Sequence, residues 1–174
     1  MNIIILGPQG SGKGTQAALI SEHFKTPILA TGDIFRAEIA SKTKLGKEVK
    51  ELIQGGFMVP DAITNSIIKN NLRKAKFRRG VILDGYPRNV AQARFLNQYW
   101  HPDHVIFLNT SRAVLIKRLK DRLVCVGPKC RLIFHKKYKP SQLKELCDAC
   151  GGKLQKRKDD NPKSIRERLK IYEH

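Results

Sequence analysis

A glycine-rich stretch near the N-terminus constrains the fold more than any other feature of the chain. It reads Gly7-Pro8-Gln9-Gly10-Ser11-Gly12-Lys13-Gly14-Thr15 and lies between an apolar run, residues 2–6, and a segment of helical period, residues 11–24. Glycines let consecutive backbone N–H groups turn toward a phosphate, and the helix N-terminus adds the positive end of its dipole. The stretch therefore predicts a phosphate-binding loop in which Lys13 reaches the β- and γ-phosphates of a nucleotide.

Four short runs rich in Ile, Val and Leu indicate fully buried strands: residues 2–6, 27–30, 80–84 and 104–108. Each run is followed by a segment of helical period: residues 11–24, 34–39, 89–99 and 112–123. Strands and helices that alternate in this way predict an α/β fold, a parallel sheet wrapped by helices through right-handed crossovers. The fold class that we expect is a three-layer P-loop fold with four strands.

Two stretches interrupt this alternation. Residues 31–79 contain helical segments broken by Gly55-Gly56 and Pro60, which predicts an insertion of small helices. Residues 123–158 are rich in Lys, Gly, Pro and Cys and lack a long apolar period, which predicts a second insertion. We expect the last helix to begin at Asn161-Pro162, because Asn caps helices and Pro suits their first turn.

The charge of the chain indicates an anionic partner without choosing one. The formal net charge is +19, and residues 112–174 carry 19 Lys and Arg against 7 Asp and Glu. Nucleotide phosphates, nucleic acid or a membrane surface would all fit this charge. The apolar runs are far shorter than the ~18 residues of a membrane helix and too short for a signal-peptide core. We therefore expect a soluble, cytoplasmic protein that binds no membrane.

The phosphate loop departs from the general pattern in an informative way. Gly14 follows Lys13 where Ser or Thr is usual, and Thr15 comes next. This form resembles the adenylate kinases and related nucleoside monophosphate kinases, and the resemblance continues from Asn2 to Tyr172. It implies transfer of the terminal phosphoryl group of ATP to AMP, giving two ADP, with Mg²⁺ as cofactor. The ATP contacts that it implies in the loop are Gly10, Ser11, Gly12, Lys13, Gly14 and Thr15.

A second segment is similar to the AMP-binding segment of this family. Thr31-Gly32-Asp33 is followed by Arg36, and the resemblance places the Thr beside adenine and the Arg on the AMP phosphate. Taken alone, the tripeptide fits a helix cap equally well. The resemblance also implies AMP contacts at Met58 and Val59.

A third segment, Asp84-Gly85-Tyr86-Pro87-Arg88 with Gln92, resembles the next family block. The segment alone would also fit a plain turn at the end of a strand. Asp84 ends a buried apolar run, where a carboxylate is costly unless it serves a cation or hydrogen-bond donors, so we expect it to orient hydrated Mg²⁺. The resemblance implies that Gly85 contacts AMP, that Arg88 binds the AMP phosphate and that Gln92 contacts the adenine.

Further arginines match the family in sequence and spacing, although each alone would fit a solvated surface charge. They are Arg118 and Arg122 on the helix predicted after the fourth strand, Arg157, and Arg168 on the last helix. Phosphoryl transfer spreads negative charge, and guanidinium groups bind phosphate oxygens in pairs. Because the attacking AMP oxygen is already anionic, no general base is required. The implied catalytic set is Lys13, Asp84, Arg88, Arg122, Arg157 and Arg168. Arg118 and Arg122 are assigned to ATP, and Arg157 and Arg168 to AMP.

Four cysteines, Cys125, Cys130, Cys147 and Cys150, are spaced as C-x4-C and C-x2-C. This pattern predicts a structural four-thiolate zinc site, with reduced free thiols, another metal or disulfides as alternatives. Zinc-type lids of the family usually open with C-x2-C, and residues 126–129 lengthen this knuckle. Phe134 resembles the family's aromatic residue near the ATP adenine, and His135 is expected to be a lid strand residue.

The resemblance implies three parts. Residues 1–30, 60–122 and 159–174 form the core, residues 31–59 the AMP-binding insertion and residues 123–158 the zinc-binding lid. The lid must close to keep water from the phosphates of ATP. Another acceptor nucleotide, GTP as donor, or a zinc-ribbon protein that binds nucleic acid are the alternatives, and the last leaves the phosphate loop unexplained.

Family chains continue past the last helix into a fifth parallel strand and a closing helix, whereas this sequence stops at His174. We therefore expect a fragment with an exposed edge at residues 104–108, reduced stability and weak ATP binding. A monomer is expected. The rival reading is a natural minimal enzyme whose open edge is covered by a second copy.

Overall fold

The computed structural model describes residues 1–127, 130, 132–157 and 159–173. Residues 128 and 129 of the lengthened cysteine knuckle lie outside this set. The chain forms two compact units. The first contains Met1–Ile53 and Met58–Thr110, and the second Gln54–Phe57 and Ser111–His174.

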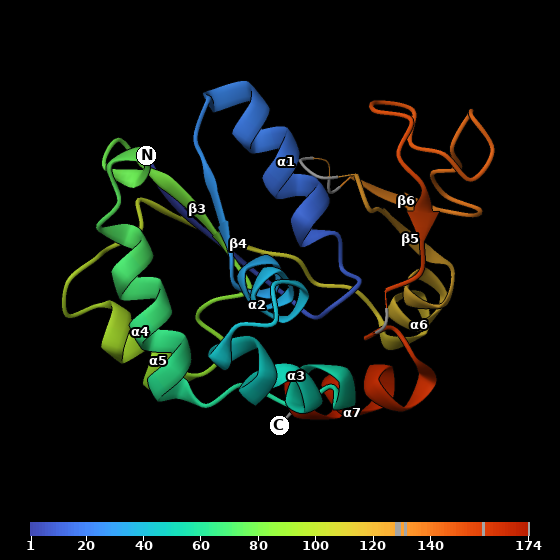
Figure 1. Ribbon diagram of the computed structural model, residues 1–174. Helices are drawn as coiled ribbons and strands as arrows, with labels where there is room; N and C mark the ends of the chain where they lie inside the picture. Colours follow the sequence, from blue (N-terminus) through green and yellow to red (C-terminus); the bar gives the residue numbers. More distant parts are fainter. Residues whose placement is uncertain (128–129, 131, 158, 174) are drawn as a thin grey trace. The chain divides into compact units, whose positions relative to one another are not determined.

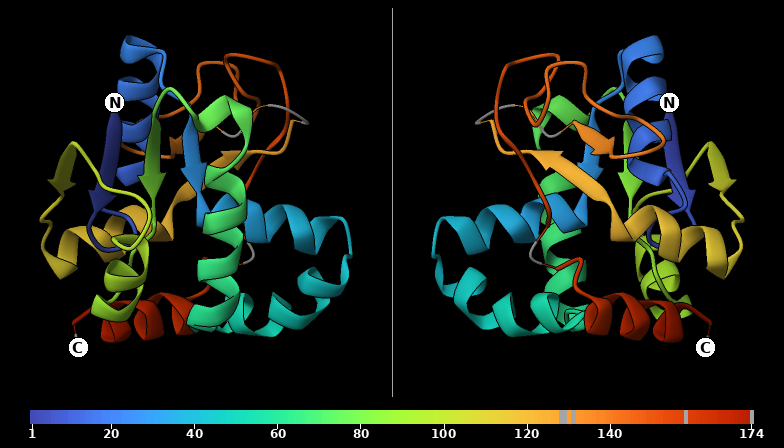
Figure 2. Two further views of the ribbon diagram at one scale, coloured as in Figure 1. Left: turned by 90° about the vertical axis from the view of Figure 1, so that its left-hand side faces the viewer. Right: turned by 90° about the vertical axis from the view of Figure 1, so that its right-hand side faces the viewer.

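The first unit is built on a four-stranded sheet (Figure 1). Its strands are β1 (Asn2–Leu6), β2 (Ile28–Ala30), β3 (Val81–Asp84) and β4 (His104–Phe107). All pairs are parallel and the order is β2-β3-β1-β4, which the left view of Figure 2 shows side by side. The predicted parallel sheet and the predicted α/β fold class are thereby confirmed.

Helices cover both faces of this sheet because the apolar side chains of each strand alternate between the faces. Ile3 and Ile5 pack with Ala17 of α1, whereas Ile4 packs with Ile68 of α4 and Leu96 of α5. Figure 1 shows α1 and the pair α4 and α5 on opposite sides of the sheet. The helical elements of this unit are α1 (Lys13–Phe24), α2 (Thr31–Ala40), α3 (Lys44–Gly55), α4 (Asp61–Leu72), the short 3₁₀ helix η1 (Ala75–Phe77) and α5 (Val90–Leu96).

One of the four strands is not buried as predicted. β4 pairs with β1 on one side, and no strand of the described residues pairs with its other side. Val105 is 56% and Phe107 58% exposed. The apolar run correctly predicted a strand, and the open edge was correctly placed on it. Full burial was wrong because it depends on neighbours that a short run does not reveal.

Two helix boundaries also differ from the sequence prediction. α2 begins at Thr31, with Ala30 in the N-cap position, so Thr31-Gly32-Asp33 forms its first turn. α6 (Arg112–Lys120) ends earlier than predicted, and the chain turns at Asp121 into a strand. Arg122, predicted on a helix, is therefore the first residue of β5.

The second unit combines two helices with a small antiparallel sheet. Its strands are β5 (Arg122–Cys125), β6 (Ile133–His135) and β7 (Leu154–Gln155), in the order β6-β5-β7. α6 packs on α7 (Pro162–Glu173) through a buried cluster of Leu115, Leu119, Ile165 and Leu169. The predicted cap of α7 is confirmed, because the Ser164 N–H donates to Asn161 Oδ1 at 2.9 Å.

Within the described residues, none of the helices has both the length and the apolar character that crossing a membrane requires.

Candidate active site and metal centre

The glycine loop follows β1 and ends in the first turn of α1, as a phosphate loop requires. Gly7 has φ of 140°, and a Cβ at this position would lie 2.6 Å from the carbonyl oxygen of Leu108. Gly12 has φ of 106° and open space around it, so here the backbone conformation alone requires glycine. The loop thus turns in a way that other residues would resist.

Lys13 is the first residue of α1, and its ammonium group folds back over the loop. Nζ donates to the carbonyl oxygens of Gly7 at 2.7 Å and of Pro8 at 2.8 Å. Gly14 and Thr15 follow in the first helical turn. This arrangement holds a cation beside the N–H groups at the start of a helix, which is an anion-binding geometry.

Asp84 lies at the carboxyl edge of the sheet, the edge from which the glycine loop departs. In the strand register it pairs with Ile5 of β1 on one side and with Ala30 of β2 on the other. The loop begins two residues after Ile5, and Thr31 directly follows Ala30. A carboxylate at this position fits a hard cation such as Mg²⁺, which takes oxygen ligands and keeps several of its waters.

The two predicted AMP segments meet at this edge although they lie more than fifty residues apart. Thr31 is buried, and its Oγ1 donates to the Gly85 carbonyl oxygen at 3.0 Å. Arg88 Nε donates to the same carbonyl at 2.8 Å. A Cβ on Gly85 would lie 3.0 Å from Thr31 Oγ1. Thr31, Gly85 and Arg88 therefore form one compact group.

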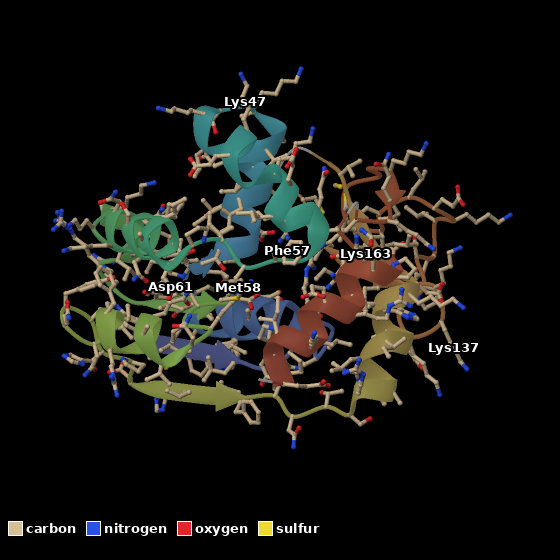
Figure 3. All side chains as sticks on the ribbon, turned by 90° about the horizontal axis from the view of Figure 1, so that it is seen from below. Lys47, Phe57, Met58, Asp61, Lys137 and Lys163 are labelled. Atoms are coloured by element: carbon tan, nitrogen blue, oxygen red, sulfur yellow. The ribbon has the colours of Figure 1, made fainter. Side chains whose placement is uncertain are left out.

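The other predicted AMP residues have different surroundings. Arg36 forms a 2.6 Å ion pair with Asp33 one turn earlier on α2. Met58, labelled in Figure 3, is half-buried. Val59 is buried in a cluster with Phe35 and Val49, so its backbone is the part left to contact a ligand.

Gln92 is 1% exposed, and both ends of its carboxamide are engaged. Oε1 accepts the backbone N–H of Arg88 at 2.8 Å, and Nε2 donates to Asp61 Oδ1 at 2.6 Å. Asn89 Nδ2 donates to both oxygens of Asp61, at 3.2 and 3.0 Å. Asp61 could not be singled out from the sequence, because an acid in the first turn of a helix is ordinary.

Tyr86 supports the same group from the core. It is fully buried, and its hydroxyl donates to Asn65 Oδ1 at 2.6 Å. Burial, with the charge of Asp61 among the lesser causes, raises the pKa of Tyr86 well above its ordinary value. The phenol therefore stays a neutral hydrogen-bond donor.

Two of the four predicted arginines of the second unit form ion pairs with acidic residues that the sequence analysis did not single out. Arg122 binds Asp160 through two hydrogen bonds, and Arg168 Nη2 lies 3.0 Å from Asp159 Oδ2. Arg118 is exposed on α6, and Arg157 is half-buried. The repeated acid in Arg157-Lys158-Asp159-Asp160 was the available signal.

The four cysteines converge as predicted. Their sulfur atoms all lie within 4.8 Å of one another, with Cys125 Sγ and Cys150 Sγ 3.4 Å apart and Cys130 Sγ and Cys147 Sγ 3.6 Å apart. A tetrahedral zinc ion with Zn–S bonds of about 2.3 Å has sulfur atoms about 3.8 Å apart. The donor set and its spacing therefore fit zinc.

Burial and backbone N–H groups act in opposite directions on the thiols. The Gly127 N–H donates to Cys125 Sγ at 3.3 Å, although burial still raises the pKa of this thiol to about 12. At Cys147 burial also opposes ionisation, but the N–H groups of Ala149 and Cys150 together with the thiols of Cys130 and Cys150 outweigh it, and the pKa falls to about 7. A Cβ on Gly152 would lie 2.9 Å from Cys125 Sγ, so the knuckle requires a small residue there.

Two residues that the sequence analysis placed in the lid, Phe134 and His135, lie on β6. Phe134 is buried with Cys125, Cys147 and Leu154, and it lines a pocket of about 180 Å³. His135 Nδ1 accepts the backbone N–H groups of Lys137 at 3.0 Å and Tyr138 at 3.1 Å. His135 therefore organises the turn after β6, in agreement with the expected strand position.

Comparisons with known proteins agree with this geometry. The family model described as adenylate kinase matches residues 5–174. The adenylate kinase of Thermoanaerobacter sp. (strain X514) is 43% identical over 178 residues, which cover 99% of this chain and 81% of the relative. The adenylate kinase of Clostridium kluyveri (strain ATCC 8527) is 41% identical over 99% of this chain and 81% of its own length. That of Thermosipho africanus (strain TCF52B) is 40% identical, with 99% and 82% covered.

Proposed function

The chain belongs to the adenylate kinase family and is an ATP:AMP phosphotransferase, and we propose that the carboxyl edge of its four-stranded sheet holds the reacting nucleotides. One observation supports this proposal above the others. The register that aligns Ile5, Asp84 and Ala30 gathers the phosphate loop, Asp84 and Thr31 at one edge. Parallel α/β sheets bind ligands at that edge.

On the donor side, the loop from Gly10 to Thr15 cradles the phosphates of ATP. Lys13 Nζ lies over the loop carbonyls, where it would contact the β- and γ-phosphates. Asp84 would hold hydrated Mg²⁺, which, when bound, neutralises charge on the phosphate oxygens. Arg118, Arg122 and Phe134 are the donor contacts proposed in the second unit.

On the acceptor side, Thr31, Gly85 and Arg88 hold AMP, with Arg36, Met58, Val59 and Gln92 as further contacts. Arg88 is exposed, and its Nε donates to the Gly85 carbonyl oxygen at the edge of the sheet. A guanidinium group donates to phosphate oxygens in pairs. The AMP phosphate attacks as an anion, so the residues position the two phosphates and stabilise the developing charge. Arg122, Arg157 and Arg168 join this set in the proposal.

We also propose that the cysteine cluster holds one structural zinc ion. The buried apolar cluster around it is small, with Cys125, Phe134, Cys147 and Leu154 as its buried members. A metal adds the stability that so small a core lacks. Zinc here would stiffen residues 123–158 and take no part in the reaction.

The three-part division into core, AMP-binding insertion and lid remains a proposal, because the two compact units divide the chain differently. A monomer and a cytoplasmic location are likewise proposed. Four free cysteines that converge on one point suit a reducing compartment.

The acceptor site is tested by calorimetric titration of AMP into the Arg88→Ala variant. We expect at least a tenfold loss of AMP affinity, since a charged phosphate contact is removed. Arg94→Ala is the matched control, because Arg94 is an exposed arginine on the following helix α5. Unchanged AMP affinity in Arg88→Ala would contradict the assignment.

A further inference from the structure

Asp61, labelled in Figure 3, is the first residue of α4. It binds two carboxamides of the segment that begins α5. Its carboxylate accepts from Asn89 Nδ2 and Gln92 Nε2. These contacts join α4 to α5 across 28 and 31 residues of sequence. The orientation of each carboxamide is also constrained by the hydrogen bond that its oxygen accepts.

The opposite end of each carboxamide faces a backbone donor. Gln92 Oε1 accepts the Arg88 N–H at 2.8 Å, and Asn89 Oδ1 accepts the Gln92 N–H at 2.7 Å. A backbone N–H only donates and a carboxylate only accepts, so both ends demand the same orientation. Gln92 is 1% exposed, which keeps water from competing for these bonds.

This fixed orientation determines which side of the Gln92 carboxamide can donate a further hydrogen bond and which side can accept one. After the bonds to Arg88 and Asp61, one N–H on Nε2 and one lone pair on Oε1 remain. Such an edge pairs with the amino donor and ring-nitrogen acceptor of adenine. On its Watson–Crick edge a 6-oxo purine has the O6 acceptor and the N1–H donor where adenine has a donor and an acceptor, so that edge would pair with the reversed carboxamide.

We propose that Asp61 is a specificity-determining positioning residue that locks the Gln92 carboxamide in the orientation that selects 6-amino over 6-oxo purine monophosphates. The proposal rests on the AMP site described above, in which Gln92 reads the base. Asp61 acts only through Gln92 and Asn89 and does not touch the nucleotide.

The test compares AMP with IMP, which differ only at the purine edge in question. Affinities of both nucleotides are measured by calorimetry, and kcat and KM by ADP formation with ATP. In Asp61→Asn a donor faces either Asn89 or Gln92, so the Asp61 end no longer enforces the Gln92 orientation and only the Arg88 N–H still favours it. We expect the preference for AMP over IMP to fall at least tenfold, mainly through a higher KM for AMP. Asp61→Glu keeps a carboxylate acceptor and should restore part of the preference.

Asn65→Ala is the matched structural control. Asn65 lies one turn further along α4 and accepts the Tyr86 hydroxyl at 2.6 Å, and the same hydroxyl lies 3.3 Å from the backbone carbonyl oxygen of Gln92. It should lower stability and leave the preference for AMP unchanged. Asp61→Ser replaces Asp61→Asn if thermal melts show that the latter is unfolded.

The outcomes separate this inference from the proposed function. If the native chain prefers AMP and the folded Asp61 variants keep the full preference, the role of Asp61 is overturned. If the native chain binds AMP no better than IMP, the assignment of Gln92 to the base fails instead, and the inference fails with it. A preference lost equally in Asn65→Ala would show a merely structural effect and would also overturn the role.

Discussion

Arg122 and Asp160 face each other through two parallel hydrogen bonds, Nε to Oδ2 at 2.7 Å and Nη2 to Oδ1 at 2.6 Å. The Arg122 side chain is 13% exposed and that of Asp160 2%. The pair joins the start of β5 to the segment before α7, 38 residues later. It fixes the plane of a guanidinium group that the proposed mechanism assigns to the transferred phosphoryl group.

Asp160→Asn should therefore reduce both stability and turnover. Removing one partner of a largely buried pair should cost about 2 kcal/mol, less than for a fully buried pair. We expect kcat to fall about tenfold, because Arg122 loses its fixed orientation. Urea denaturation and the rate of ADP formation measure the two effects.

The exposed pair of Arg112 and Glu173 provides the control for that prediction. Both side chains are about half exposed. Glu173→Gln should change stability by less than about 1 kcal/mol and leave kcat unchanged. Equal losses in both variants would mean that the buried pair has no special role.

Lys13→Ala should lose at least about 100-fold in kcat while the protein stays folded. Lys13 donates to two carbonyls of its own loop, so its loss should affect phosphate binding more than the packing of the core. Lys50→Ala is the control, because Lys50 is an exposed lysine of α3. Near-normal turnover in folded Lys13→Ala would refute the assigned phosphate loop.

Zinc should be present at one atom per chain in protein purified without chelator. A mercurial that titrates the four thiols should release this zinc stoichiometrically, since all four sulfurs lie within one ligand sphere. After chelation, residues 123–158 should become more sensitive to protease than the four-stranded sheet. Four freely titratable thiols without bound metal would contradict the zinc proposal.

The exposed edge strand makes a further prediction about stability. Val105→Lys should lower the free energy of unfolding by less than about 1 kcal/mol, because the Val105 side chain is largely in water. Ile5→Ala, at a fully buried position of the adjacent strand, should cost about 2–5 kcal/mol. Because the chain is proposed to be a monomer, Val105→Lys should leave its sedimentation unchanged, whereas a native chain paired along the open edge would dissociate in this variant. Similar costs for the two variants would show that β4 is covered.

The phosphate loop, the strands and the cysteine cluster were predictable because each rests on a local pattern. Glycine spacing, apolar runs and thiol spacing lie within a few residues of one another, and the structure confirms their positions. The position of Arg122 was not predictable in this way. The helical period continues to residue 123, but the chain turns at Asp121, and the pairing of β5 with β6 and β7 decides its conformation.

The exposure of β4 and the role of Asp61 needed tertiary information. Strand order determines that β4 has one neighbour, and an apolar run of four residues cannot encode that order. Asp61 gains its partners only when α4 packs beside α5, 28 and 31 residues away. The family resemblance supplied the contacts assigned to AMP, but it named no residue that orients them.

ADP formation by the 174-residue chain with ATP, Mg²⁺ and each of AMP, CMP, UMP and GMP tests the central claim most directly. The account predicts turnover with AMP, at least about tenfold lower kcat/KM with the other three, and loss of the AMP reaction in Lys13→Ala. Folded protein that forms no ADP from AMP, or that uses another monophosphate better, would contradict it.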